Sequence, residues 1–247
     1  MSLKIRFLLT SKCTATCAYC HNEGQSGAGA SLLHMEQIEH ILERFAQCNQ
    51  PIDEIVLSGG EPTLHKHVGA IAQRCKKAAR HLSMDSHGGH PELLAKALPY
   101  LDELKLHIDA FDAEEQRLSM GIELAAVDES IRQTQAHPTL KLIANHPLTD
   151  VHAGIRFVNE ARARNIDCKI IQLFARGLAP CVNWTHQGYE QLADGSWLHA
   201  NGKHRLYSKS CEEKLNHENT WFIGADGVRT SVDGAVISSV DNFYPLG

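Results

Sequence analysis

Several features are missing from this 247-residue chain, and each absence excludes a class of protein. No run of apolar residues is long enough to span a bilayer. The first residues, Met-Ser-Leu-Lys-Ile-Arg, lack the apolar stretch and small-residue cleavage site of a signal peptide. The net charge of -5 gives no electrostatic reason to expect binding to nucleic acid or to a membrane surface. We therefore expect a cytoplasmic protein with neither a nucleic acid nor a membrane as partner.

The composition predicts a folded protein with a substantial core. Hydrophobic residues make up 43% of the chain and charged residues 21%, which are ordinary values for a globular protein. The length suits one large α/β domain, or a core domain with a small extension. A reducing compartment would keep the eight cysteines as thiols.

Apolar periodicity predicts an alternation of strands and helices. Six short apolar runs read as strands, at residues 4–9, 54–57, 81–85, 104–109, 140–145 and 168–174. Helical spacing is found between them, at residues 32–48, 68–79, 92–98, 114–135 with a break near Gly121, and 151–164. Strands separated by single helices build a parallel sheet, and chemistry in such sheets lies at the C-terminal ends of the strands.

The chain changes character after residue 175. Helical patterns disappear, and Asn201-Gly202 marks a two-residue hairpin turn between two apolar stretches. Asp226-Gly227 and Asp233-Gly234 punctuate a second small meander. We therefore divide the chain into a core at residues 1–175 and a β-rich extension at residues 176–247 that covers one end of the core and its substrate.

Three cysteines follow the first predicted strand, at Cys13, Cys17 and Cys20. This C-x3-C-x2-C spacing can hold three irons of a four-iron, four-sulfur cluster and leave the fourth iron open. A structural zinc site would need a second pair of cysteines, and the chain has no other C-x2-C pair. A redox disulfide would use only Cys17 and Cys20, and a chance group of buried thiols is the remaining alternative.

A second motif stands at the end of the second predicted strand, Ser58-Gly59-Gly60-Glu61-Pro62. Together with the cysteine triplet and the aromatic Tyr19, this segment resembles the radical S-adenosylmethionine (SAM) superfamily. The resemblance covers roughly residues 3–175. It implies a partial (β/α)6 barrel, one [4Fe-4S] cluster on Cys13, Cys17 and Cys20, and SAM as the second cofactor.

The resemblance also implies roles for the residues of the motifs. Gly59 and Gly60 would let backbone groups approach the SAM amino group closely. Glu61 is expected to shape its turn rather than to act as a base. Tyr19 is expected to line the adenine pocket with its backbone, with simple packing as the alternative. An external electron donor of the flavodoxin or ferredoxin type would reduce the cluster.

Three further positions match the family's cofactor-binding segments more loosely: Ser86, Asp109 and Asn145. Each follows or ends a predicted strand, and each has a helix cap or a turn as its alternative role. His87, beside Ser86, departs from the asparagine that is usual in relatives.

The extension resembles that of GTP 3′,8-cyclase and of SPASM/twitch enzymes, but Ser231 stands where a cysteine is common there. We therefore expect no auxiliary cluster. Cys181 and Cys211 are candidates for a hydrogen-atom or proton donor, with a structural role as the alternative. Cys48, Cys75 and Cys168 are expected to be buried.

Basic residues of the extension offer contacts for a phosphate or carboxylate of the substrate. The two candidates are Arg176, just beyond the sixth strand, and Arg229, and solvated surface charge is their alternative.

These patterns predict a radical SAM enzyme that abstracts hydrogen from a small molecule, such as a nucleotide, a sugar or a natural product. Two alternatives stay open. Tyr19-Cys20-His21-Asn22 is similar to a segment of glycyl-radical-activating enzymes, which act on a partner protein. A peptide-modifying enzyme is the other alternative, although no separate leader-binding domain is expected.

Overall fold

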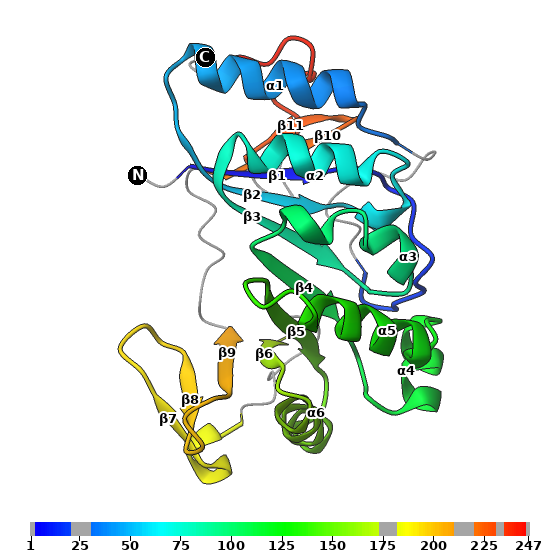
Figure 1. Cartoon of the computed structure of the whole chain (residues 1–247), viewed down its shortest axis with the longest axis vertical. Coiled ribbons are helices and arrows are strands. Elements are labelled where there is room, and N and C mark those ends of the chain that lie inside the picture. The colour runs from blue at the N-terminus through cyan, green and yellow to red at the C-terminus, as the bar shows by residue number, and fades with distance from the viewer. Residues whose placement is uncertain (1–2, 21–30, 173–181, 210–219, 231–234, 246–247) are drawn as a thin grey trace.

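The computed structural model describes residues 3–20, 31–172, 182–209, 220–230 and 235–245. Its centre is a parallel sheet of six strands in chain order, drawn in Figure 1. These strands are β1 (Lys4–Leu8), β2 (Ile52–Ser58), β3 (Ala79–Ser86), β4 (Glu103–His107), β5 (Lys141–Leu148) and β6 (Asp167–Gln172). The connecting helices are α1 (Met35–Gln47), α2 (Val68–Lys76), α3 (Pro91–Leu94), α4 (Ala113–Met120), α5 (Leu124–Gln135) and α6 (Val151–Ala163). The predicted partial (β/α)6 barrel is confirmed, and its sheet is open rather than closed.

Local sequence explains where the helices begin and end. Asp112 caps α4 by accepting the N–H groups of Glu114 and Glu115, and Asp150 caps α6 by accepting the Ala153 N–H. The predicted break near Gly121 is present, because Gly121 has φ +70° and ends α4 in the left-handed conformation. The helix predicted over 92–98 is shorter than expected. It ends at Leu94, and a 3-10 turn, Leu98–Tyr100, completes the connection.

The extension adds strands to both edges of the sheet. β10 (Thr220–Gly224) pairs parallel to β1, and β9 (Arg205–Lys209) pairs parallel to β6. Antiparallel partners complete the two edges: β11 (Gly227–Arg229) beside β10, then β8 (Trp197–His199) and β7 (Tyr189–Gln191) beyond β9. The predicted hairpin at Asn201-Gly202 is therefore present, as is the turn of the predicted meander at Asp226-Gly227, whereas Asp233-Gly234 lies outside the described residues. The described strands of the extension therefore lie at the two edges of the sheet.

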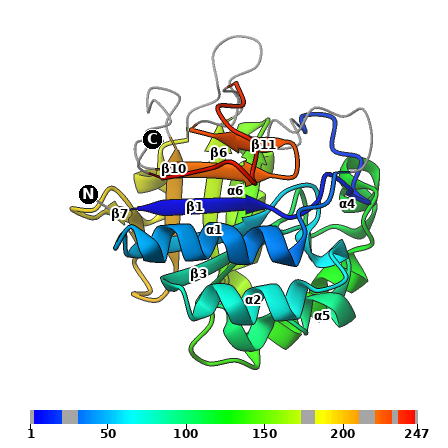
Figure 2. The same ribbon diagram turned by 90° about the horizontal axis from the view of Figure 1, so that it is seen from above.

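The two faces of the sheet differ because side chains alternate along each strand. Ile5, Phe7 and Ile55 belong to the outer face, and the core under the helices is built on such residues. Figure 2 shows α1 and α2 lying over this face. The alternate residues Arg6, Ser83 and Glu103 belong to the inner face.

The described cysteines fit most of the expectations. Cys75 in α2 and Cys168 in β6 are fully buried, as predicted. Cys48 is half-buried instead, because it lies at the C-terminal cap of α1, where the helix face turns toward solvent.

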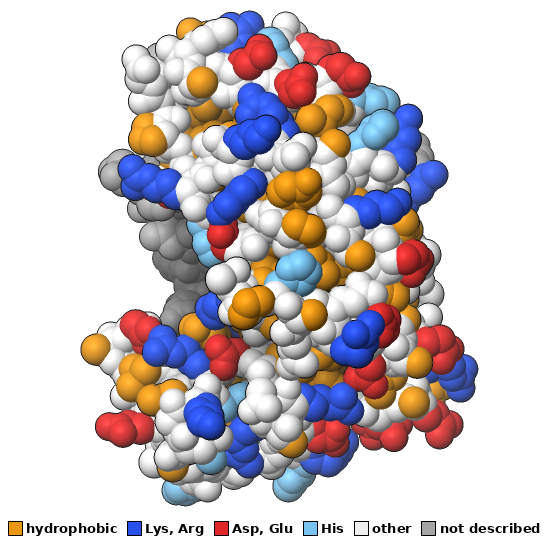
Figure 3. Space-filling model, in the orientation of Figure 1, with side chains coloured by type: hydrophobic (Ala, Val, Ile, Leu, Met, Phe, Trp, Pro, Cys, Tyr) orange, Lys and Arg blue, Asp and Glu red, His pale blue; other side chains and the backbone are white. Residues whose placement is uncertain are grey.

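None of the helices in the described ranges is both long and apolar enough to cross a lipid bilayer. The face drawn in Figure 3 carries acidic and basic side chains interspersed with one another.

Candidate active site

The three predicted cluster ligands lie on one loop at the C-terminal end of β1. Cys13 and Cys20 are exposed and Cys17 is half-buried. The loop is folded on itself and fastened to its neighbours, since the Cys20 N–H donates to the Cys17 carbonyl at 3.1 Å and the Thr16 N–H donates to the Met120 carbonyl at 2.9 Å. The thiols therefore lie on an ordered surface loop, which is a requirement for a preformed cluster site.

The three thiols are not arranged to bind one metal ion together. Among the described residues, no group of three or more Cys, His, Asp or Glu side chains could hold one metal ion. A [4Fe-4S] cluster makes a different demand, because each thiolate binds its own iron at a separate corner of the cluster. Burial raises the pKa of the Cys13 thiol and raises that of Cys17 to about 11. Iron must therefore displace protons from these thiols when it binds.

The glycine turn after β2 is packed against the backbone of the cysteine loop. The Gly60 N–H donates to the Thr10 carbonyl at 2.6 Å, and the Glu61 N–H donates to the Lys12 carbonyl at 2.7 Å. A Cβ on Gly59 would lie 2.5 Å from the Thr10 oxygen, and one on Gly60 would lie 2.3 Å from the Lys12 oxygen. Glycine is thus required here for contact between the two motifs, in addition to the approach to SAM that the sequence predicts.

Glu61 holds this turn to the end of β3. The side chain is fully buried and accepts hydrogen bonds from the Thr63 N–H at 3.1 Å and the Thr63 hydroxyl at 2.7 Å. It also accepts from the Ser86 hydroxyl at 2.8 Å and from the His87 N–H at 2.9 Å. With these donors the carboxylate has the turn-shaping geometry that the sequence predicts.

The Ser86–Gly89 segment is a compact, buried polar turn. The Ser86 hydroxyl donates to Glu61 and accepts from the Gly88 N–H at 3.0 Å. Because the Gly89 N–H donates to His87 Nδ1 at 2.9 Å, a neutral His87 ring carries its proton on Nε2, which faces Thr14 Oγ1 at 3.1 Å. Burial lowers the His87 pKa, which favours this neutral ring. His87 therefore connects β3 to the cysteine loop at the position of the usual asparagine.

The end of β4 contacts the cysteine loop through Tyr19. The Tyr19 hydroxyl donates to Asp109 Oδ1, and it lies 2.8 Å from His107 Nε2. The sequence predicts that Tyr19 lines the adenine pocket with its backbone or simply packs, and it does not select His107. A signal for His107 is present in the strand itself, where a polar residue alternates with the apolar Leu106 and Ile108.

The C-terminal ends of the strands, with the loops that follow them, form the rim of the sheet. Below this rim, the inner face is lined with paired charges. The ion pairs are Lys4–Glu54 at 2.7 Å, Arg6–Asp85 at 2.5 Å, Lys105–Glu103 at 3.0 Å and Lys141–Glu103 at 2.9 Å. Burial alone would raise the Asp85 pKa, but Arg6 and Lys105 outweigh it and lower the pKa to about 2. Asp85 is therefore ionised at neutral pH.

Two oxygen atoms near this face have no hydrogen-bond partner among the described residues. They are Asp85 Oδ1 and Asn145 Oδ1, both buried from solvent. A buried acceptor without a donor costs about 1–3 kcal/mol. SAM has amino and ribose hydroxyl donors, so these unpaired acceptors, together with the cysteine loop and the glycine turn, fit the cofactors that the sequence implies.

The remaining predicted site residues divide into two groups. Arg229 in β11 is buried and paired with Asp226, while its Nη1 has no hydrogen-bond partner in the described residues. Arg176, Cys181 and Cys211 lie outside the described residues, as does Ser231.

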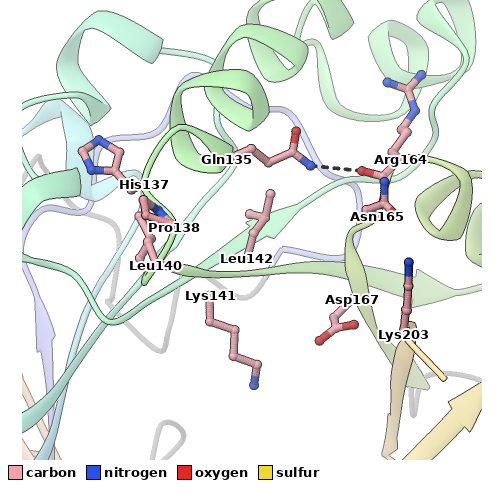
Figure 4. Close-up of a pocket in the computed structure, with 10 residues that line it drawn as sticks. All are labelled: Gln135, His137, Pro138, Leu140, Lys141, Leu142, Arg164, Asn165, Asp167 and Lys203. Carbon is pink, nitrogen blue, oxygen red and sulfur yellow. Dashed lines mark hydrogen bonds between the residues drawn. The ribbon is translucent and has the colours of Figure 1, made fainter.

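A solvent-open pocket of about 520 Å³ lies at the opposite end of the sheet, where β5 and β6 begin. Figure 4 shows Lys141, Asp167 and Lys203 around it, with Gln135 hydrogen-bonded to the Arg164 carbonyl. Since catalytic sites of such barrels lie at the C-terminal ends of the strands, this pocket is distinct from the candidate active site.

Comparison with known proteins identifies the family. Residues 7–170, more than half of the chain, match the family model of the Radical SAM superfamily. A "Probable GTP 3',8-cyclase" of Sulfolobus acidocaldarius is 28% identical over 93% of this chain and 78% of its own length. Another, of Pyrococcus horikoshii, is 32% identical over 52% of this chain and 40% of its own length, so this alignment spans less than half of that relative.

Solved structures share the fold at low sequence identity. Native anSMEcpe with bound AdoMet has a TM-score of 0.67 at 13% identity, covering 99% of this chain and 79% of that one. Streptococcus suis SuiB has a TM-score of 0.68 at 11% identity, covering 98% of this chain and 64% of that one. Members of the superfamily use a [4Fe-4S] cluster and S-adenosylmethionine and need a reductant. The chain belongs to the Radical SAM superfamily and is an enzyme with similarity to GTP 3′,8-cyclases.

Proposed function

We propose that the chain cleaves SAM reductively and uses the product to abstract hydrogen from a small molecule. When bound, the cluster on Cys13, Cys17 and Cys20 would supply the electron for cleavage of a carbon–sulfur bond of SAM, and SAM would supply methionine and the 5′-deoxyadenosyl group that takes the hydrogen atom. The observation that carries the proposal is the contact between the cysteine loop and the glycine turn, through the Gly60–Thr10 and Glu61–Lys12 hydrogen bonds.

Each residue of the rim has a proposed task. Cys13, Cys17 and Cys20 hold the cluster, and Gly59 and Gly60 let the backbone approach both the loop and SAM. Glu61 and Ser86 fix the turn beside the cofactor, and the unpaired Asn145 Oδ1 accepts a hydrogen bond from SAM. Asp109 acts from the end of β4 through its contact with Tyr19.

The substrate proposal is a nucleotide, a sugar or a natural product. Arg229 supports an anionic group on the substrate, because one nitrogen of its buried guanidinium lacks a partner. Arg176 has the same proposed task. Cys181 and Cys211 are proposed as structural residues, with hydrogen donation as their alternative.

The relatives' cyclase reaction is not assigned to this chain. Ser231 stands at a position where the SPASM/twitch pattern commonly has a cysteine, so we propose a single cluster. Iron analysis of the anaerobically reconstituted chain should give about four irons per chain. About eight irons would refute the single cluster.

The electron donor is proposed to be a flavodoxin or a ferredoxin, in a reducing, cytoplasmic location. The exposed thiols of Cys13 and Cys20 support a reducing compartment, because they would have to stay unoxidised until the cluster forms.

The central test is SAM cleavage by the anaerobically reconstituted protein with dithionite. We expect methionine and 5′-deoxyadenosine, and their complete absence would overturn the proposed function. Cys17→Ala should abolish both the cluster absorbance and the cleavage. Cys48→Ala is the matched control, because Cys48 is a half-buried thiol at the end of α1, outside the motif loop, and should leave both unchanged.

A further inference from the structure

Tyr19 connects the cysteine loop to the end of β4 through its hydroxyl group. The hydroxyl has one hydrogen, and this hydrogen is donated to Asp109 Oδ1. His107 Nε2, at 2.8 Å from the hydroxyl oxygen, must then be the donor in the second hydrogen bond. The same Nε2 lies 3.5 Å from Asp109 Oδ1, so the three side chains form one closed group.

This group is itself held in place by α4. Gln116 is fully buried, and its Oε1 accepts the N–H groups of Asp109 and Ala110, both at 3.0 Å. Its Nε2 contacts the Met120 sulfur at 3.3 Å, and the Met120 carbonyl accepts the Thr16 N–H of the cysteine loop. The loop is therefore fastened to the β4–α4 unit twice, by a side chain and by its backbone.

Asp109 is a negative charge beside this loop. Burial alone would raise its pKa, but hydrogen bonds from His107 and Tyr19 outweigh burial and keep the pKa below its usual value. Its Oδ1 accepts the hydrogen bond of Tyr19, and Tyr19 lies between the two predicted cluster ligands Cys17 and Cys20, so the charge is held against this part of the loop. A negative charge close to a cluster ligand disfavours the addition of an electron to the cluster.

We propose that Tyr19, His107 and Asp109 are positioning residues that fix the cysteine loop and set the reduction potential of the cluster. Tyr19 holds the loop, His107 orients the phenol, and Asp109 supplies the charge that lowers the potential. The inference rests on the proposed role of Cys17 as a cluster ligand.

The test is the midpoint potential of the reconstituted holoenzyme, measured by EPR-monitored titration. Asp109→Asn keeps an oxygen that accepts the Tyr19 hydrogen bond but removes the charge. We expect the potential to rise by about 59 mV or more, which is a tenfold change in the equilibrium constant of a one-electron couple. Asp112→Asn is the matched control, because Asp112 is an exposed cap of α4 and asparagine caps a helix equally well.

A rise confined to Asp109→Asn supports the inference, and equal potentials in both variants overturn it. If Asp109→Asn does not bind iron, hydrogen exchange of the Tyr19→Phe variant tests whether Tyr19 holds the cysteine loop. Faster hydrogen exchange at residues 13–20 in this variant than in the wild type, with Tyr100→Phe unchanged, supports the role in holding the loop, and equal exchange overturns it. Failure of the wild type to assemble a cluster would instead refute the proposed function, so the two failures are distinguishable.

Discussion

The two faces of the sheet use opposite chemistry on the same six strands. The outer face carries fully buried aliphatic and aromatic residues, such as Phe7 and Ile55, against helices whose own buried residues include Phe45. The inner face carries ion pairs, such as Arg6–Asp85 and Lys105–Glu103. Apolar contact stabilises the fold without selecting a ligand, whereas fixed charges and unpaired acceptors can recognise one. Because successive side chains of a strand point to opposite faces, the residues that stabilise the fold and those that can recognise a ligand lie on different faces of the same strands.

The rim joins the two faces, and its disruption should have the largest effect. In Gly60→Ala, the new Cβ would lie 2.3 Å from the Lys12 carbonyl oxygen, so the cysteine loop has to move. A displacement of about 1 Å can cost a reaction about 100-fold, and we expect SAM cleavage to fall by about that factor. Gly195→Ala is the control for cleavage: its φ of +80° strains a side chain, but no neighbouring atom lies within 4 Å of its Cβ position and it lies in the β7–β8 turn, outside both motifs. Wild-type cleavage by Gly60→Ala would contradict this account of the turn.

Truncation on the outer side should cost the most stability. Phe45→Ala removes a fully buried ring that packs against Phe243, with centroids 5.9 Å apart. We expect the free energy of unfolding to fall by about 3–5 kcal/mol in denaturant titrations. Leu118→Ala, at an exposed position of α4, should change it by less than about 0.5 kcal/mol. Similar losses in the two variants would mean that the helix layer does not stabilise the sheet.

Removal of a charge from the inner face should have a smaller, pH-dependent effect. The folded pKa of Asp85 is about 2, below its value in an unfolded chain, so its contribution is present above about pH 4 and is lost as the pH falls toward 2. Asp85→Asn should therefore lower stability by about 2 kcal/mol at pH 7 and by less near pH 3. Asp128→Asn, which breaks an exposed pair with Arg164, should cost at most about 1 kcal/mol. A loss for Asp85→Asn that does not vary with pH would exclude this ionic origin.

His146 is a polar exception on the outer face, and it should have the smallest effect. The ring stacks on Phe157, and burial lowers its pKa to about 4. The unfolded chain binds a proton near pH 6.5 and the folded chain does not, so stability should fall as the pH drops from 6.5 toward 4. His146→Phe should keep the stack and remove about 1–2 kcal/mol of this loss between pH 7.5 and 5.

Urea titrations at the two pH values would measure the effect of His146→Phe. His152→Gln, at an exposed position of α6, is its control and should leave the pH dependence unchanged. An unaltered pH dependence in His146→Phe would show that another group titrates in this range.

Local patterns predict the six strands, their helices and two turns of the extension, at Asn201-Gly202 and Asp226-Gly227. The patterns work because apolar periodicity and turn residues such as Asn201-Gly202 act over a few residues. They do not predict that β9 and β10 extend the sheet at opposite edges, because strand pairing between distant segments leaves no local signal. Cys48 shows the same limit, since its burial depends on where a helix ends.

The sequence by itself determined the motifs, their order and their places after strands, and with them the family and the cofactors. Only the tertiary structure decided which groups meet: Gly60 with the Lys12 carbonyl, Glu61 with Ser86, and Tyr19 with His107 and Asp109. Motifs are recognised from residue type and short spacing, and both can be read directly from the sequence. A hydrogen bond between residues 88 or 90 positions apart depends instead on how the sheet brings the strand ends together.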